Sequence, residues 1–543
     1  MSDNHLQDEP PLASHFSGRK DSQIQMWVQE AIFGHRYVEE QLPYMLVLEV
    51  LAICRVLEND TSSSDYNGLF KHPLGQENRH EIIQIPIIKS EALRYILFKD
   101  RSLDTIAKDQ NLSPEERFAC WIERLNKGYT SEVKSGYINF SYLRKRFDDR
   151  FEDAHQAIRI LQGLEIDIYN NRRYTSRFLV PRGSSLILND VDEKFTADRR
   201  FFGRGGELVY LMLSRSQHNE SLATAVRNTF LSNKDPVDRI AAKLIPDDPA
   251  GKITSATIGY LPMRHHPAYD RMAEDWLSIL DLKKLPTPQK FEPLFRITAL
   301  NMVRYFAERA RTVAGNQNIE PIPLDMLGGR DADLRSVSKS CLQRHRRVID
   351  DAVENYIRTR IEAQSGWQQA QSSWQQVSRA TGSDNALELI EKTFDAGGWR
   401  KDQKDVREPE RWLSDFINDA KNRSRNNITG VIKPLGTHAG FVVARGGAGT
   451  WFSSSDDFLE PLVLAIVKEK PITISDFLAR LYERYGLVIG PVEANRAYSS
   501  PPCDISSFED NVRAFERRLT GLGYVKRLSD DCAFVSNVYT GAE

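Results

Sequence analysis

The sequence has few of the features that mark several large protein classes. Its five cysteines are scattered over 543 residues without a Cys-x-x-Cys pair, so neither a disulfide framework nor a structural zinc site is expected. Basic and acidic side chains number 73 and 75, and this near-balance excludes a uniformly basic nucleic-acid coat. The apolar stretch at 42–53 is too short to cross a bilayer and predicts a buried helix instead.

What is present is the composition of a folded protein. Apolar residues make up 41% and charged residues 27% of the chain, which is typical of globular domains. At about 100–200 residues per domain, about two to four domains are expected. The polar segment 1–23 lacks the apolar core of a signal peptide, so we expect a cytoplasmic protein without a membrane partner.

Apolar spacing predicts helices through most of the chain. Near the N-terminus the pattern favours helices at 24–57, 90–98 and 113–125. The third opens with Ser113 as N-cap, Pro114 in the first turn and two glutamates at the positive helix end. Further helices are predicted at 207–213, 267–280, 291–311 and 337–376. Because strands and helices do not alternate, a doubly wound sheet is not expected.

Two segments, 151–180 and 507–538, share one order of elements. Each has an amphipathic helix that ends in Leu-x-Gly-Leu, followed by a strand, a tight turn and a second strand; the two motifs are Leu161-Gln-Gly-Leu164 and Leu519-Thr-Gly-Leu522. Upstream helices at 140–147 and 474–485 complete the order typical of a winged helix-turn-helix. Ser506 and Glu509 have the spacing of a capping box, and 486–504 is predicted to be an insertion in the second module.

The predicted fold class is therefore mainly α with small β-hairpins, as a helical body with two winged helix-turn-helix-like modules. The predicted domains are an N-terminal helical domain at 1–135, a winged-helix-like module at 136–185, a central helical domain at 186–440 and a C-terminal winged-helix-like domain at 441–543. Such an arrangement favours binding of other macromolecules over transformation of a substrate.

Basic side chains of the two modules are the candidate nucleic-acid contacts. The first hairpin carries four arginines and no acid between residues 170 and 183, which suits contact with phosphates or entry into a minor groove. In the second module nearby acids offset the basic residues, and either hairpin can instead be solvated or dock a protein. The candidate residues are Arg172, Arg173, Arg177, Arg182, Arg517, Arg518, Lys526 and Arg527.

No motif predicts a catalytic residue, a cofactor site or a metal site. The adjacent His265 and His266 lack a ligand pair at i, i+4 with a general base between. The glycine-rich turns at 203–206 and 446–449 fit hairpins or loops rather than a nucleotide-binding loop. Basic runs at 339–347 and 421–425 are more typical of solvated faces. Scattered carboxylates leave a divergent metal-dependent nuclease as a minor alternative.

Several stretches resemble a known prokaryotic family. In the C-terminal part these are 451–458, which reads WFSSSDDF, 477–490 and 528–535; upstream they are 139–143, 198–202 and 206–213. The family comprises accessory proteins of antiphage defence operons, in particular of the methylation-associated defence system. The resemblance covers most of the chain and carries over no catalytic residue. It implies partners, namely operon subunits with methyltransferase, nuclease, kinase or ATPase activity.

These observations lead to two hypotheses. The first is a non-enzymatic subunit of a bacterial antiphage defence complex, which binds double-stranded DNA, scaffolds partner subunits such as an ATPase or a nuclease, or does both. The second is a purely protein-interaction scaffold whose winged-helix modules make no nucleic-acid contact.

Overall fold

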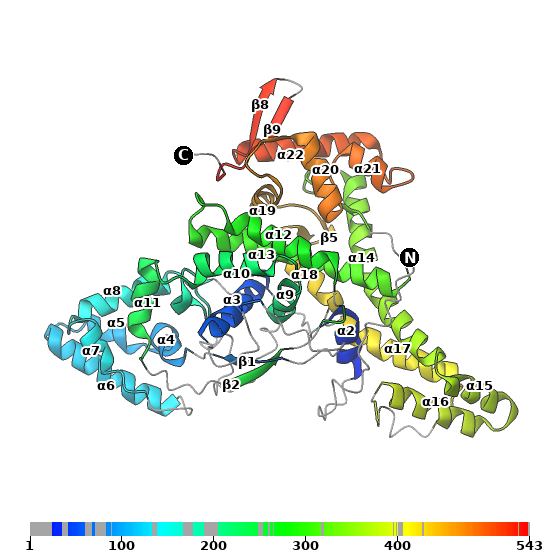
Figure 1. The fold of residues 1–543 in the computed structure, drawn as a ribbon, viewed down its shortest axis with the longest axis horizontal. Coiled ribbons are helices and arrows are strands. Elements are labelled where there is room, and N and C mark those ends of the chain that lie inside the picture. The colour runs from blue at the N-terminus through cyan, green and yellow to red at the C-terminus, as the bar shows by residue number, and fades with distance from the viewer. Residues whose placement is uncertain are drawn as a thin grey trace.

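Helices make up most of the molecule (Figure 1), which confirms the predicted mainly α class with small strands. The computed structural model describes residues 24–34, 42–59, 68–70, 83–87, 90–132, 138–166, 177–188, 205–247, 254–258, 261–263, 265–315, 320–394, 396–397, 399, 405–425, 428–529 and 532–540. Within these ranges, no helix is both long and apolar enough to span a membrane.

The helix α13 (Thr287–Val313) lies at the centre of the body. It is enclosed on all sides, because apolar residues from successive turns, among them Leu294, Ile297 and Leu300, are fully buried. The helices packed on α13 are α2 (Ile24–Phe33), α3 (Pro43–Asn59), α12 (Pro267–Leu280), α14 (Ala332–Glu362), α18 (Ile428–Ala439) and α19 (Asp456–Ile466). Two further helices, α9 (Gly205–Ser214) and α10 (Asn219–Val226), pack on α12.

A helical lobe lies at one end of the body, at the lower left of Figure 1. Its elements are α4 (Glu91–Arg94), the π-helical turn η1 (Tyr95–Lys99), α5 (Ser102–Ala107), α6 (Pro114–Glu132), α7 (Tyr142–Arg146), α8 (Phe151–Gln162) and α11 (Pro236–Leu244). Short turns η3 (Ser184–Leu186) and η4 (Arg227–Leu231) join it to the body. The predicted cap of α6 is confirmed: the Glu116 amide donates to Ser113 Oγ at 3.3 Å, and the Ser113 amide donates to Glu116 Oε2 at 2.8 Å.

A helical arm extends from the opposite end of the body (Figure 1). It consists of the far half of α14, then α15 (Ser365–Gln376), α16 (Arg379–Thr393) and α17 (Pro409–Arg425). The prediction of one helix over 337–376 is wrong, because α14 ends at Glu362 and a separate helix, α15, begins at Ser365 and packs on α16. A Cβ on Gly382 would lie 2.5 Å from the Cα of Trp374, so this close approach requires glycine.

Short strands form small two-stranded sheets, one of which pairs the body with the C-terminal part of the chain. They are β1 (Ile83–Ile87) with β2 (Thr254–Ile258), β3 (Ile322–Pro323) with β7 (Leu487–Val488), and β4 (Val442–Arg445) with β5 (Gly449–Phe452). The glycine-rich turn at 446–449 thus closes a hairpin, as predicted. The other glycine-rich segment differs from its prediction, because Gly205 and Gly206 begin α9, and the Gly206 amide donates to Glu49 Oε2 at 2.8 Å.

A buried histidine lies where α14 meets α13 and the β4–β5 hairpin. His345 is 1% exposed, its Nδ1 lies 3.0 Å from the Cys341 carbonyl oxygen, and its ring packs edge-on against Phe452. Burial, with a smaller contribution from the Arg304 guanidinium, lowers the pKa of His345 from 6.5 to about 3. The imidazole therefore stays neutral in the folded chain at all ordinary pH values.

Acidification is expected to destabilise the fold through His345. The unfolded chain binds a proton at this residue below its ordinary pKa of 6.5, whereas the folded chain does not until about pH 3. Between these values the free energy of unfolding falls by up to about 1.4 kcal/mol per pH unit as the pH falls. In His345→Asn, denaturant unfolding at a series of pH values should lack this component. Parallel pH slopes for the two proteins would contradict the assignment.

Candidate partner-binding surface of the C-terminal unit

The C-terminal unit, defined here as residues 456–535, combines helices with a three-stranded antiparallel sheet. It contains α19, β6 (Ile472–Thr473), α20 (Ile474–Tyr485), β7, α21 (Pro491–Ala497), α22 (Ile505–Gly521), β8 (Val525–Ser529) and β9 (Cys532–Val535). The strand order is β6-β9-β8, and the hairpin β8–β9 extends beyond α22 at the top of Figure 1. The predicted order, a helix that ends near Leu522 and a hairpin that follows it, is therefore present.

The two long helices of the C-terminal unit pack through aromatic residues. Phe477 of α20 stacks on Phe515 of α22 with 6.0 Å between ring centroids, and both side chains are fully buried. The buried Asn511 fixes α22 to the body, because its side-chain amide donates to the carbonyl oxygens of Leu324 and Ile489 and accepts from the Met326 amide. The orientation of α22 is thus set by the body as well as by the unit itself.

The start of α22 differs from its prediction. Asp504 is the N-cap, and its carboxylate accepts from the Ser506 amide at 3.0 Å. The predicted capping box of Ser506 and Glu509 is therefore wrong, because the helix begins one residue before Ser506. The predicted insertion 486–504 also contains regular structure, namely β7 and α21.

The outward face of α22 carries charges of both signs. Of its basic residues, Arg513 lies 2.8 Å from Asp510 and 3.6 Å from Glu509. Glu516 lies 3.3 Å from Arg527 of the hairpin. All of these side chains except Glu516 are exposed by half or more. This surface therefore carries several ion pairs and is not uniformly basic.

Two of the four predicted basic contacts in the C-terminal unit already have acidic partners. Arg518 donates to Asp456 at 2.6 Å and to the Ser454 carbonyl oxygen at 2.9 Å, so it secures the start of α19. Arg527 pairs with Glu516. Arg517 and Lys526 are exposed and have no acidic partner within ion-pair distance among the residues that the structure describes.

The predicted hairpin of the first module falls largely outside the described residues, and Arg172 and Arg173 lie there. The two remaining predicted contacts are described. Arg177 pairs with Glu165, and its guanidinium lies 4.6 Å from the centroid of the Phe98 ring. Arg182 pairs with Asp235 at 3.0 Å. Both arginines thus make contacts within the lobe.

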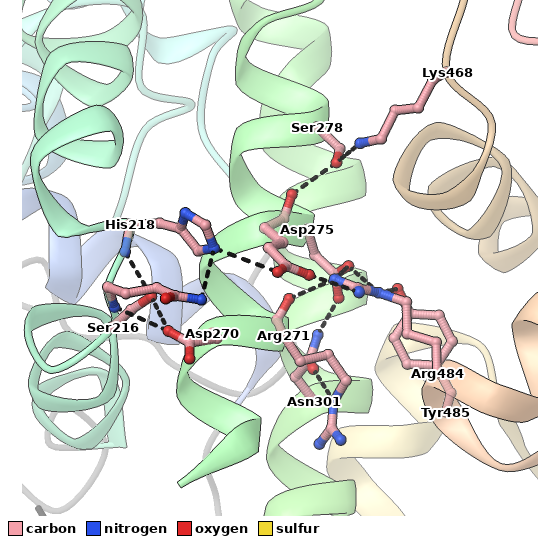
Figure 2. Close-up of polar contacts among 12 residues, drawn as sticks. Ser216, His218, Asp270, Arg271, Asp275, Ser278, Asn301, Lys468, Arg484 and Tyr485 are labelled. Carbon is pink, nitrogen blue, oxygen red and sulfur yellow. Dashed lines mark hydrogen bonds and ion pairs between the residues drawn. The ribbon is translucent and has the colours of Figure 1, made fainter. Parts of the chain in front are cut away.

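An ionic cluster fixes the C-terminal unit to α12 (Figure 2). Asp275 of α12 is fully buried, and Arg484 of α20 donates to it at 2.5 and 2.8 Å. The same guanidinium donates to Glu274 and to the Arg271 carbonyl oxygen, both at 2.8 Å. Burial is the largest single influence and would lower the pKa of Arg484, but Asp275, Tyr485 and the hydrogen bonds to Glu274 and Asp275 together outweigh burial and raise it. Arg484 therefore stays charged and joins the unit to the body.

The cluster continues from α12 into α13. Asn301 donates to the second oxygen of Asp275 at 2.6 Å and accepts from Arg271 at 2.9 Å. Arg271 also contacts both carboxylate oxygens of Glu308, at 2.9 and 3.2 Å. Burial would raise the pKa of Glu308, but the nearby guanidinium groups outweigh it and lower the pKa below its usual 4.5. A continuous chain of ion pairs and hydrogen bonds thus runs from α20 to α13 at the centre of the molecule.

One of the two adjacent histidines considered as metal ligands has a structural role instead. His266 caps α12, because its Nδ1 accepts from the Ala268 amide at 3.1 Å. Within the ranges that the structure describes, no three His, Cys, Asp or Glu side chains gather as metal ligands would.

Comparison with known families bears on this unit. Residues 461–535 match the family model described as methylation-associated defense system protein MAD7. No curated protein matches the chain. The match confirms the resemblance to a defence-system protein over this one segment.

The matched MAD7 segment contains most of the C-terminal unit. It begins within α19 and ends with β9, so Arg484 and the whole of α22 lie inside it, whereas Asp275 lies outside. The pair that joins the C-terminal unit to α12 therefore also joins the matched segment to the rest of the chain. The sequence prediction missed this pair, although Arg484 lies in a helix that was predicted.

Removing the arginine of this pair is expected to destabilise the whole chain. Arg484→Ala leaves the buried Asp275 carboxylate without its cation, which costs about 3–5 kcal/mol, and adding Asp275→Asn should restore part of the loss. The control is Arg480→Ala, one turn earlier on α20 and exposed, which should change stability by less than about 0.5 kcal/mol. Denaturant unfolding measures all four proteins, and equal losses for Arg484→Ala and the control would refute the role of the pair.

Proposed function

We propose that the chain is a non-enzymatic subunit of a bacterial antiphage defence complex, and that its C-terminal unit binds a partner protein of that complex. The defence role is supported by the match at 461–535. The choice of a protein partner is carried by the outward face of α22, where Arg513 pairs with both Glu509 and Asp510.

A surface of this kind suits a protein better than a polyanion. Binding of DNA depends on cations that replace the counterions of the phosphates. On α22 and the hairpin, Arg513, Arg518 and Arg527 already have acidic partners, and the exposed Glu509 and Asp510 would repel phosphates. A protein with its own mixed charges can pair with both signs, which favours the correct partner and register.

The architecture of the unit supports the winged-helix interpretation. The two helices α20 and α22 precede a hairpin whose strands join β6 in the order β6-β9-β8. In a winged helix-turn-helix the second helix and the hairpin form the contact surface. We infer that α22 and β8–β9 form that surface here.

Binding of duplex DNA is the second candidate. It is favoured by Arg517 and Lys526, which are exposed and have no acidic partner among the described residues. Two basic side chains on a helix and an adjacent hairpin can reach neighbouring phosphates.

Charge reversal on α22 is expected to remove the partner protein. When the full chain is co-expressed with the products of neighbouring defence genes, Glu509→Arg with Asp510→Arg should abolish co-purification of one of them, since both acids lie on the outward face. The matched control is Asp384→Arg with Glu388→Arg, two exposed acids of α16 on the arm, which should leave the complex intact. Equal retention of every neighbour by wild type and the α22 variant would refute the proposal.

The purified chain is expected to retard a short DNA duplex only weakly. Substituting Arg517→Ala with Lys526→Ala, or Arg172→Ala, Arg173→Ala and Arg177→Ala together, should leave this retardation unchanged in a gel shift. A shift that weakens steeply with added salt and disappears in either variant would establish the DNA candidate instead.

A further inference from the structure

A groove lies at the junction of the C-terminal unit and the body, next to the Arg484 cluster. We call it the junction groove. It is formed by the end of α12, the segment 281–284, the segment 467–472 and the stretch 537–540, and its volume is about 1050 Å³. An adjoining hollow of about 710 Å³ shares Glu274, Ser278, Lys468 and Arg480 with it. Sites for small ligands have volumes of about 300–1,000 Å³, so the junction groove is of the right size for one.

The charge of the junction groove is positive in a chain whose net charge is −2. Its basic lining residues are Lys283, Lys284, Lys468, Lys470 and Arg480. Its acidic lining residues are Glu274, Asp281 and Glu469. Glu274 is already paired with Arg484 at 2.8 Å. The cations therefore outnumber the available carboxylates, and the groove attracts anions.

Lys468 is the basic residue closest to the Arg484 cluster. Figure 2 shows its side chain pointing to Ser278 of α12, to whose hydroxyl oxygen its ammonium group donates. Partial burial, and then the nearby Arg484 guanidinium, lower the pKa of Lys468. A bound anion would offset both effects, so Lys468 is suited to hold one. The Ser278 hydroxyl in turn donates to the Glu274 carbonyl oxygen at 2.7 Å, so it positions the Lys468 ammonium group at the groove.

The junction groove is also lined by apolar and aromatic residues, whose chemistry differs from that of its basic residues. Leu282 and Val467 of the floor are buried, and Ile472 is half-buried. The half-buried ring of Tyr539 lies at the groove. Its backbone is fixed there, because Asn537 accepts from the Tyr539 amide at 3.1 Å and donates to the Val467 carbonyl oxygen at 3.1 Å. An apolar floor with an aromatic ring suits a planar base, whereas the basic rim suits phosphates.

From this combination we propose that the junction groove binds a nucleotide, with its phosphates on Lys468 and Arg480 and its base against Tyr539 and the apolar floor. The ligand would contact both α12 and the C-terminal unit. The inference rests on the groove alone and does not depend on the identity of the partner protein.

Calorimetric titration of the full chain with ATP tests the proposal. Lys468→Ala with Arg480→Ala is expected to weaken binding by at least about tenfold, because two charge-assisted contacts are lost. Tyr539→Ala should weaken it as well. The control is Lys392→Ala with Arg411→Ala, which removes two exposed cations from the arm and should leave the affinity unchanged. Unfolding midpoints of all variants establish that they are folded.

Two companion titrations separate the ligand classes. Inorganic tripolyphosphate should bind more weakly than ATP and be insensitive to Tyr539→Ala, because it has no base. Tripolyphosphate binding as tightly as ATP would overturn the nucleotide assignment, and so would binding of a short single-stranded oligonucleotide in place of ATP. Absence of ATP binding to the wild-type chain, or equal binding by the Lys468 and Arg480 variant, would overturn the proposal as a whole.

Discussion

The ion pair between Arg484 and the buried Asp275 is the charged contact among those that fix the C-terminal unit to the body, beside the packing of α19 and the hydrogen bonds of Asn511. A carboxylate without solvent requires a fixed cation, and here the cation is supplied by a helix more than two hundred residues away in the sequence. Through Asn301, Arg271 and Glu308 the same network reaches α13. The network therefore joins the C-terminal unit, and with it α22, to the centre of the helical body.

Many arginine side chains are buried or paired within the fold, so the near-balance of charges in the sequence does not give the charge of the surface. Arg304 and Arg309 are almost fully buried, and in the arm Lys421 and Arg425 of a predicted basic run pair with Glu354 and Asp350. Cations that support the fold are not available to phosphates. The junction groove differs in this respect. It lies beside the Arg484 network, yet its basic lining residues outnumber its acidic ones.

Much of the helical fold could be predicted from the sequence, because helix signals are local. The predicted helix over 267–280 agrees with α12 at both ends, and the four residues 113–116 suffice to predict the Ser113 cap. The break between α14 and α15 at 363–364 could not be predicted, because α15 packs on α16, which follows it in the chain. The pair of Arg484 with Asp275 could not be predicted either, because the two residues lie far apart in the sequence and no local pattern connects them. The domain boundaries at 135, 185 and 440 stay predictions, as do the contacts of Arg172 and Arg173.

Hydrogen exchange of the intact chain, followed peptide by peptide, tests the central claim most directly. Amides of buried helices exchange only when their cooperative unit opens. If the ionic network joins the C-terminal unit to the body, α12, α13 and α20 should exchange at a common slow rate. Rapid exchange throughout α20 and α22, while α13 stays protected, would show that the unit opens by itself and would contradict the account.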